Sequence, residues 1–539
     1  MNGEKGLMVA GGVVAVAKRR SSFVEGALIL GVSGVVTRLI GAFFKIPLGN
    51  LLGGSGMGAF TVAYQIYSAL FLLSTAGLPV AISKMVAEAR GRGCPGEGKR
   101  IFRVALGTFS LVGLLLSAGL WVASPQVAAL VGSPQAAPAV RAVAPSLFLV
   151  SIAAVIRGYH QGLGDMVPTA VSQVLEAVGK LVVGYGAAVI LLNRGCSPAQ
   201  ASAGAIGGVT VGSLLGCLYL LLHPREEEEG IGGRGLSVGR CLVRLLAISL
   251  PVMAGSLVLS LSNLMDMAIV MNRLQDIGFS QQASGGLYGT YNMVTTLFHL
   301  PQTLITALGV SLIPPLSGAL SRKNRMLARR LSDSALEFAA LLSLPAGVGF
   351  CLLGRPLLEL IYFARPQDCA LGAPLLVILG PGVFFVAMTT MTNAILQAMG
   401  RVRTPVYTLA AGALCKLGVT YVLTGKPTVH IGGAPWGTVC CYGLITLLNL
   451  RALYRAGMGV SWDKVFFRPA LAAGLMGAFL VFLRLPVEGA LGPRWGFAAL
   501  TLSGAAFYGL MLLAVGALPR EDILLLPGGK NLAKVLRLK

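Results

Sequence analysis

The chain of 539 residues is 55% hydrophobic and 12% charged, and its mean hydropathy is +0.78. Soluble domains carry about 25% charged residues, so this composition excludes a water-soluble globular protein and predicts one embedded in a bilayer. The formal net charge of +23 is compatible with a nucleic-acid partner. However, the basic residues gather between apolar segments, which is typical of membrane topology signals, and we expect no nucleic acid to bind.

The first half of the chain contains a short lead-in and six apolar segments. We expect residues 1–20 to be a cytoplasmic lead-in, because their apolar run is too short to span a bilayer. The first predicted lobe, residues 21–223, contains segments of about 20 residues, near 26–47, 59–83, 104–123, 140–159, 167–192 and 201–222. A hydrophilic segment follows, which we predict to be a cytoplasmic linker over residues 224–240.

The second half repeats this organisation and adds a C-terminal extension. The second predicted lobe, 241–455, has segments near 245–271, 285–313, 335–353, 371–396, 405–424 and 433–450. Residues 456–518 contain two more, near 466–483 and 496–516, and a basic tail occupies 519–539. The fourteen segments predict an all-α polytopic membrane protein with about 14 transmembrane helices. With both termini in the cytoplasm, most of the 43 lysines and arginines lie on the cytoplasmic side.

An internal repeat relates the two predicted lobes. At an offset of 236 positions, Phe148, Gln161, Gly164, Lys180, Leu181, Val183 and Tyr185 match Phe384, Gln397, Gly400, Lys416, Leu417, Val419 and Tyr421. At an offset of 227, Gly58, Tyr64 and Phe71 match Gly285, Tyr291 and Phe298. We therefore predict two pseudo-symmetric six-helix lobes plus two C-terminal helices. Repeated membrane halves around buried charge are typical of secondary transporters, not of enzymes.

Several motifs resemble one family of membrane transporters. Residues 35–90 contain a T-R-x-x-G-x-x-x-K-I-P-L run, a glycine-rich turn and an S-T-x-G-L-P-x-A-I-S-K run, and the second lobe contains SLIPPLSGAL and NAILQAMGR. These motifs resemble the SpoVB/MurJ-like polysaccharide and lipid II flippases of the multidrug/oligosaccharidyl-lipid/polysaccharide exporter superfamily. The resemblance covers essentially the whole chain. It implies that an undecaprenyl-linked cell-wall precursor, first of all lipid II, moves from the inner to the outer leaflet of a bacterial plasma membrane by alternating access.

The resemblance is closer to the SpoVB-like branch than to the lipid II flippases of Gram-negative bacteria. In the latter we expect a second arginine where Phe44 stands, and a glutamate and an arginine where His299 and Thr296 stand. Lys45 keeps the first helix cationic, whereas the charged pair of the eighth helix is lost.

Cations within the apolar segments are the predicted substrate-binding residues. A lipid-linked sugar carries a pyrophosphate that must cross about 30 Å of hydrocarbon, so its carrier needs fixed positive charges. Arg38 lies in the middle of the first predicted helix and Lys45 follows two turns later on the same face. The other candidates for the cavity are Lys84, Lys180, Lys416 and His299. The alternatives are a structural pair with a carboxylate or carbonyl for Arg38 and a position at the outer interface for Lys45. For Lys84 the alternative is a topology signal, and for His299 it is simple packing.

Other polar residues are candidates for gating or ion coupling. Glu176 and Lys180 are spaced i,i+4, which favours an ion pair or a gate. Lys416 lacks such a neighbour on its own helix, so it either pairs across the cavity or acts as a fixed cation. Its most attractive partner is Asp266, which lies near Asn263 in the seventh helix. Asp266 could instead bind Na⁺ or a proton. The candidates for an inward gate are Arg157, Gln161, Gln397 and Arg401. The alternative for the charged ones is that they only set the topology.

The remaining motifs narrow the function. The sequence has no P-loop, no cysteine and histidine spacing that suggests a metal site and no nucleophile constellation, so we expect no cofactor beyond a coupling Na⁺ or H⁺. The alternatives are a flippase for another lipid-linked polysaccharide or spore-envelope precursor, a multidrug exporter, and a scaffold for wall-synthesis enzymes. The cations argue against the exporter. We expect a monomer that contacts membrane lipids, with cell-wall synthesis enzymes as candidate partners.

Overall fold

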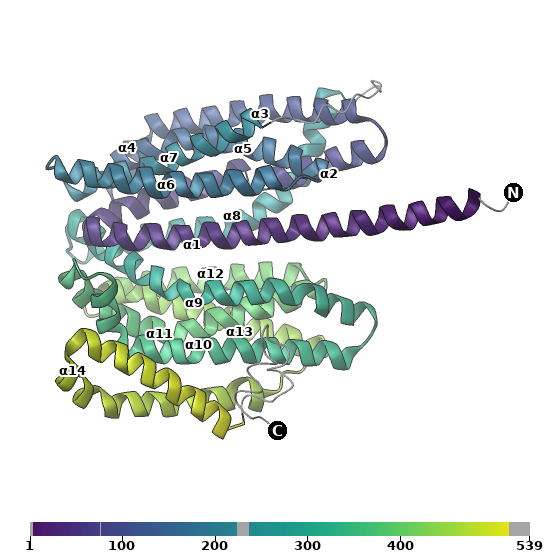
Figure 1. Cartoon of the computed structure of the whole chain (residues 1–539). Helices are drawn as coiled ribbons and strands as arrows, with labels where there is room; N and C mark the ends of the chain where they lie inside the picture. The colour runs from purple at the N-terminus through teal and green to yellow at the C-terminus, as the bar shows by residue number, and fades with distance from the viewer. Residues whose placement is uncertain (1–3, 76, 224–236, 517–539) are drawn as a thin grey trace. The chain divides into compact units, whose positions relative to one another are not determined.

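The protein is helical throughout the part of the chain that the structure describes. The computed structural model describes residues 4–75, 77–223 and 237–516, in which there is no strand (Figure 1). The predicted all-α class is confirmed. The segment near 59–83 runs across the break between a helix that ends at Thr75 and one that begins at Leu78, and each of the other thirteen lies wholly or almost wholly in one helix. Within these ranges eleven stretches are long and apolar enough to cross a membrane, and the stretch Ile29–Gly91 covers two predicted segments. The predicted tail and most of the predicted linker lie outside the described residues.

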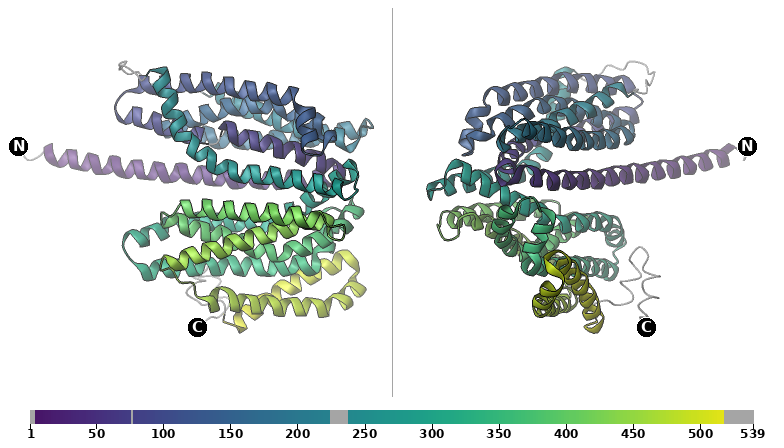
Figure 2. Two further views of the ribbon diagram at one scale, coloured as in Figure 1. Left: turned by 180° about the vertical axis from the view of Figure 1, so that it is seen from behind. Right: turned by 60° about the vertical axis from the view of Figure 1, so that its left-hand side comes forward.

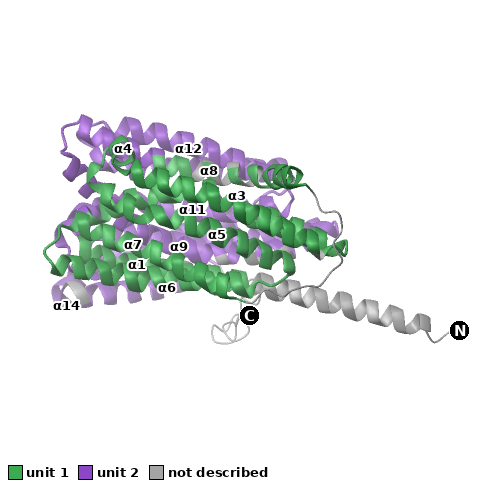
Figure 3. Ribbon diagram, turned by 90° about the horizontal axis from the view of Figure 1, so that it is seen from above, with its two compact units in different colours: residues 1–52, 56–264 green, residues 53–55, 265–539 purple. Residues whose placement is uncertain are grey.

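The chain forms two compact units, which Figure 3 shows in two colours. Unit 1 comprises Met1–Leu52 and Gly56–Leu264, and unit 2 comprises Gly53–Ser55 and Met265–Lys539. The long helices outside the C-terminal extension are α1 (Glu4–Thr75), α2 (Leu78–Gly91), α3 (Pro95–Val122), α5 (Ala137–Leu163), α6 (Val167–Asn193), α7 (Pro198–Leu222), α8 (Val238–Asp276), α9 (Gln281–Ser321), α10 (Arg325–Ile361), α11 (Pro366–Ala398), α12 (Arg403–Thr424) and α13 (Gly433–Arg455). A short helix, α4 (Ser124–Leu130), follows α3. The expected lead-in, from Glu4 onward, is the beginning of α1.

The division between the units falls inside α8, between Leu264 and Met265. The sequence predicts the boundary between the two lobes earlier in the chain, in the linker at 224–240. The limits of the predicted lobes concern membrane topology and stay a prediction.

The helices of the two units pack in the same pairs. In unit 1, α3 packs on α5, α5 on α7, and α6 on α7; in unit 2, α10 packs on α11, α11 on α13, and α12 on α13. A glycine with a left-handed backbone follows the end of both α5 and α11, Gly164 with φ 89° and Gly400 with φ 75°. These two glycines are related by the offset of 236, and such caps favour glycine because other residues are strained there. The sequence repeat thus corresponds to a repeated helix packing.

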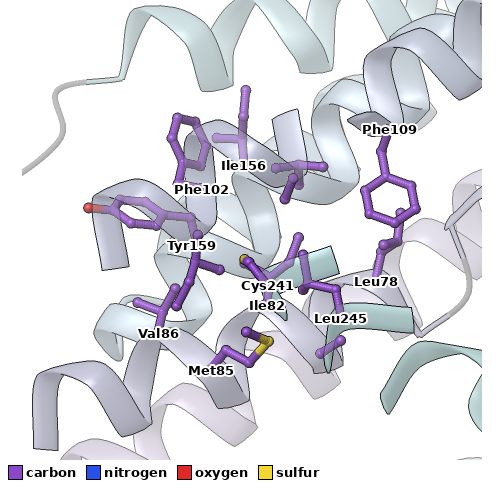
Figure 4. Packing of buried hydrophobic residues seen from close by; sticks show 14 of the residues in the cluster. Leu78, Ile82, Met85, Val86, Phe102, Phe109, Ile156, Tyr159, Cys241 and Leu245 are labelled. Atoms are coloured by element: carbon purple, nitrogen blue, oxygen red, sulfur yellow. The ribbon is translucent and has the colours of Figure 1, made fainter. Parts of the chain in front are cut away.

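A buried apolar cluster fixes the helices at one end of unit 1. Figure 4 shows side chains from α2, α3, α5 and the first turns of α8 meeting in this cluster. The rings of Phe102 and Tyr159 lie 4.8 Å apart, centroid to centroid. Lipid tails are as apolar as these side chains, so close packing supplies most of the stabilisation that the hydrophobic effect supplies in water. Helix α5, which carries Arg157, is thereby fixed against α2 and α3.

The predicted C-terminal pair of helices forms a hairpin in unit 2. Helix α14 (Arg468–Ala514) reverses direction at Gly492, where φ is 70° and ψ is 174°, and Figure 2 shows its two segments folding back on each other. The rings of Phe479 and Phe507 stack at 4.3 Å across the hairpin. Phe482 and Trp495 are 82% and 74% exposed, as expected for side chains that face lipid.

Candidate functional site

Two lysines of unit 1 share one aromatic ring. Lys45 and Tyr64 lie on α1, and Lys180 lies on α6. The Lys180 Nζ is 4.8 Å from the centroid of the Tyr64 ring and 5.3 Å from that of Phe44. The Lys45 Nζ is 5.8 Å from the same Tyr64 ring. The structure therefore brings together two predicted substrate-binding residues, and we call Lys45 and Lys180 the lysine pair.

The carboxylate closest in sequence to Lys180 is engaged elsewhere. Glu176 Oε2 lies 3.1 Å from Arg157 Nη2, and Arg157 Nε donates a hydrogen bond of 2.9 Å to Ser172 Oγ. Of the two alternatives that the i,i+4 spacing left open, the ion pair between Glu176 and Lys180 is therefore wrong. Arg157 reaches Glu176 from α5 and bonds Ser172 as well, a forked geometry that guanidinium provides and ammonium does not.

The lysine pair consequently keeps its charge uncompensated within unit 1. In the described part of the chain, neither Lys45 nor Lys180 has a carboxylate within ion-pair distance, and both side chains are only partly exposed. Their aromatic partners attract cations by about 0.5–2 kcal/mol each and leave the ammonium hydrogens available. An anion that enters the site can therefore bind both ammonium groups without displacing an acidic side chain.

Close backbone contact between α6 and α7 sets the position of Glu176 and Lys180. A Cβ atom added at Gly212 of α7 would lie 2.4 Å from the carbonyl oxygen of Glu176 and 3.0 Å from the amide nitrogen of Lys180. Small residues allow this approach in membranes, where helices associate through packing. Gly212 thus determines how deeply this face of α6 is held against its neighbour.

In unit 2 the repeat-related lysine has a carboxylate partner. The Lys416 Nζ of α12 lies 2.9 Å from Asp266 Oδ2 of α8, which confirms the predicted pair. Thr420 Oγ1 donates a hydrogen bond of 3.0 Å to the other oxygen, Asp266 Oδ1. Asp266 is 2% exposed. The equivalent lysines, Lys180 and Lys416, thus occupy opposite electrostatic environments.

The network around Arg157 also has an uncharged counterpart in unit 2. Adding 236 to the positions of Arg157, Ser172, Glu176 and Ser213 gives Asn393, Thr408, Gly412 and Asn449. Asn449 is fully buried; it accepts a hydrogen bond of 2.8 Å from Thr408 and donates one of 2.8 Å to Asn393. These residues were missed in the sequence, although the offset of 236 would have identified them. One unit holds these positions with an ion pair and the other with amides.

Several predicted residues lie apart from these contacts. The backbone of Arg38 lies in α1, but its side chain lies outside the described residues. Gln161 Nε2 donates a hydrogen bond of 3.3 Å to Thr169 Oγ1. The ring nitrogen Nδ1 of His299 is 2.7 Å from Gln302 Oε1 on its own helix. The exposed candidates are Lys84, Asn263, His299, Gln397 and Arg401.

The described residues offer no group of three or more histidine, cysteine, aspartate or glutamate side chains that could hold a metal ion. The predicted alternative at Asp266, a bound Na⁺ or proton, must share its carboxylate with the Lys416 ammonium at 2.9 Å. Two positive charges at about 4 Å repel by roughly 4 kcal/mol at an effective dielectric of about 20. The arrangement does not fit an additional cation while Lys416 is in place.

The Arg157–Glu176 pair allows a first prediction. The side chains are 11% and 24% exposed, so Glu176→Gln should lower the free energy of unfolding by about 2–3 kcal/mol by leaving Arg157 without its counter-charge. Thermal unfolding of the purified protein in detergent measures this. The double variant Arg157→Met with Glu176→Leu should recover most of the loss. A Glu176→Gln variant as stable as the wild type would contradict the buried pair.

Comparisons with known proteins agree with this fold. The family model described as "Polysaccharide biosynthesis protein" matches residues 23–319, and the model described as "MatE" matches residues 251–422. The chain is 27% identical to stage V sporulation protein B of Bacillus subtilis (80% of this chain, 83% of that protein). It is 24% identical to the lipid II flippase MurJ of the same organism (74% and 76%). A solved structure of lipid II flippase MurJ, in an inward closed conformation, matches with a TM-score of 0.69 at 14% identity, covering 90% of this chain and 98% of that one.

Proposed function

Because this chain belongs to the polysaccharide biosynthesis protein family, we propose that it moves an undecaprenyl-linked cell-wall precursor from the inner to the outer leaflet, with lipid II as the first candidate. The family and the fold support a multi-pass bacterial membrane protein that acts as a flippase or transporter rather than as a catalytic enzyme. The similarity to stage V sporulation protein B favours a spore-envelope precursor as the second candidate. In this proposal both termini are cytoplasmic and the cycle is one of alternating access.

The lysine pair is the observation that supports an anionic head group. Lys45 and Lys180 present two ammonium groups to one ring, and no carboxylate of the described residues neutralises them. A pyrophosphate offers several oxygens that accept charge-assisted hydrogen bonds, each contributing about 1.5–3 kcal/mol. Such bonds are stronger than the contacts with the rings, so the head group would replace the aromatic faces as the main partner of each ammonium group.

The rings also suit a carrier that must release its cargo. When the head group leaves, the ammonium groups return to the faces of Tyr64 and Phe44 and do not remain bare in a poorly solvated site. The free energy of the empty site is thereby lowered, and the affinity for pyrophosphate stays moderate. This balance favours turnover over tight binding.

Rescue of bacteria depleted of their own lipid II flippase tests the proposal. The wild-type chain should restore growth, and the double variant Lys45→Gln with Lys180→Gln should not, at equal membrane levels. Lys464→Gln, at an exposed lysine of unit 2, is the matched control and should rescue fully. Failure of a well-inserted wild type would exclude lipid II as the cargo, whereas full rescue by the double variant would exclude the lysine pair as its binding site. Arg38→Ala in the same assay tests the second predicted cation of α1.

A further inference from the structure

The ammonium group of Lys416 lies beside Asp266, at the place where the sequence also allowed a bound Na⁺ or proton. Sequence reasoning gave Asp266 two roles, as the partner of Lys416 or as a site for Na⁺ or a proton. In the structure both oxygens of Asp266 are engaged, Oδ2 with the Lys416 ammonium at 2.9 Å and Oδ1 with the Thr420 hydroxyl at 3.0 Å. Each of these partners supplies positive charge or a hydrogen-bond donor to the carboxylate.

The surroundings of the pair supply little that a second cation could use. The ionisable groups that interact with the pair from neighbouring helices are the phenols of Tyr288 and Tyr291 on α9, the phenol of Tyr442 on α13 and the thiol of Cys441, also on α13. Tyr291 shares a hydrogen bond of 3.0 Å with Thr438. Small hard cations favour several oxygen ligands that include carboxylates, and the carboxylate in this cluster is already neutralised.

The comparison of the two units shows that this arrangement is particular to unit 2. Lys180, the repeat-related lysine, rests on aromatic rings, and Glu176 beside it is bound to Arg157. Within the described residues, Lys416 has an acidic partner and Lys180 has none. The single negative charge of Asp266 therefore needs one cation beside it, and the Lys416 ammonium group of the same chain is that cation.

We propose that Lys416 is a tethered counter-ion that takes the place of a coupling cation at Asp266, so that the wild-type protein binds no sodium ion there. Lys416 and Na⁺ carry the same charge, and removal of the ammonium group would leave a buried carboxylate with a hydroxyl donor and an open volume beside it. Such a carboxylate must bind a replacement cation or take up a proton, and sodium is the cation that the test supplies. The inference goes beyond the proposed function, because it does not depend on which lipid-linked sugar is carried.

The test compares unfolding temperatures of purified full-length protein in detergent with NaCl or with choline chloride at equal ionic strength. The wild type should unfold at the same temperature in both salts. Lys416→Met should unfold about 5–10 °C lower in choline chloride. Sodium should restore part of that loss with a saturable dependence on concentration. Adding Asp266→Asn to Lys416→Met should restore stability in choline chloride and abolish the sodium effect, because the buried charge is then absent.

Lys180→Met is the matched control at the repeat-related position and should show no sodium dependence. Two results would overturn the proposal. One is a saturable sodium stabilisation of the wild type that Asp266→Asn abolishes, and the other is a Lys416→Met variant that keeps the wild-type unfolding temperature in choline chloride. Because the unfolding assay uses no transported lipid, its result does not depend on the rescue experiment that tests lipid II as the cargo.

Discussion

A Lys180→Gln variant is expected to bind a pyrophosphate-bearing lipid about 10- to 100-fold more weakly than the wild type, because one charge-assisted hydrogen bond contributes about 1.5–3 kcal/mol. Glutamine keeps most of the side-chain length and removes the charge that rests on Tyr64 and Phe44. Binding of lipid II to the protein in nanodiscs gives the dissociation constant directly. Growth rescue should fall in parallel.

The control is the repeat-related lysine. Lys416→Gln removes an ammonium group from the same place in the second copy, but that group is bound to Asp266, so the affinity of the folded protein should change less than threefold. Lys180→Arg keeps the charge and should bind at least ten times more tightly than Lys180→Gln. Equal weakening by Lys180→Gln and Lys416→Gln would mean that the aromatic setting of Lys180 does not select it as an anion site.

Adding one methyl group at Gly212 is expected to be among the most damaging small changes in unit 1. The new Cβ of Gly212→Ala would lie 2.4 Å from the Glu176 carbonyl oxygen, and because that atom belongs to the backbone, α6 and α7 must separate. Overpacking typically costs about 1–3 kcal/mol, and we expect about 3 kcal/mol here. Thermal unfolding in detergent and the amount of protein in the membrane both report the loss.

A second glycine of α7 provides the comparison. A Cβ at Gly207 meets only Ala142 Cβ, at 4.0 Å, so Gly207→Ala should be neutral or slightly stabilising because alanine favours the helix. Both variants change the same helix by the same methyl group. If the two unfolded at equal temperatures, the close approach of α6 and α7 would not be a determinant of stability.

The sequence predicted the helices well because their signal is local. Runs of about 20 apolar residues have no alternative to helix in a bilayer. Thirteen of the fourteen segments lie wholly or almost wholly in one helix, and the segment near 59–83 is divided between α1 and α2. The repeat was also visible, since residues such as Gly164 and Gly400 have the same local task, a left-handed helix end. Neither signal required knowledge of which helices are neighbours.

The partners of the charged side chains were predicted less well, because a helix face does not identify its neighbour. For Glu176 the spacing along one helix suggested a pair with Lys180 or a gate, yet Arg157 approaches it from another helix. For Asp266 the sequence left open a pair with Lys416 or a bound cation, and the structure shows the pair. Tyr64 and Phe44 were not identified as partners of Lys180, because aromatic residues are common in membrane helices and nothing in their spacing indicates a cation.

The different partners of Lys180 and Lys416 also predict how many anions one polypeptide binds. A duplicated carrier with two equivalent lysine sites would bind two anions per polypeptide. Here one copy keeps an uncompensated ammonium group beside Lys45, and the other has its ammonium group fixed to Asp266. On the proposed function, one polypeptide should therefore saturate with a single pyrophosphate head group, because the ammonium group of Lys416 is already neutralised by Asp266.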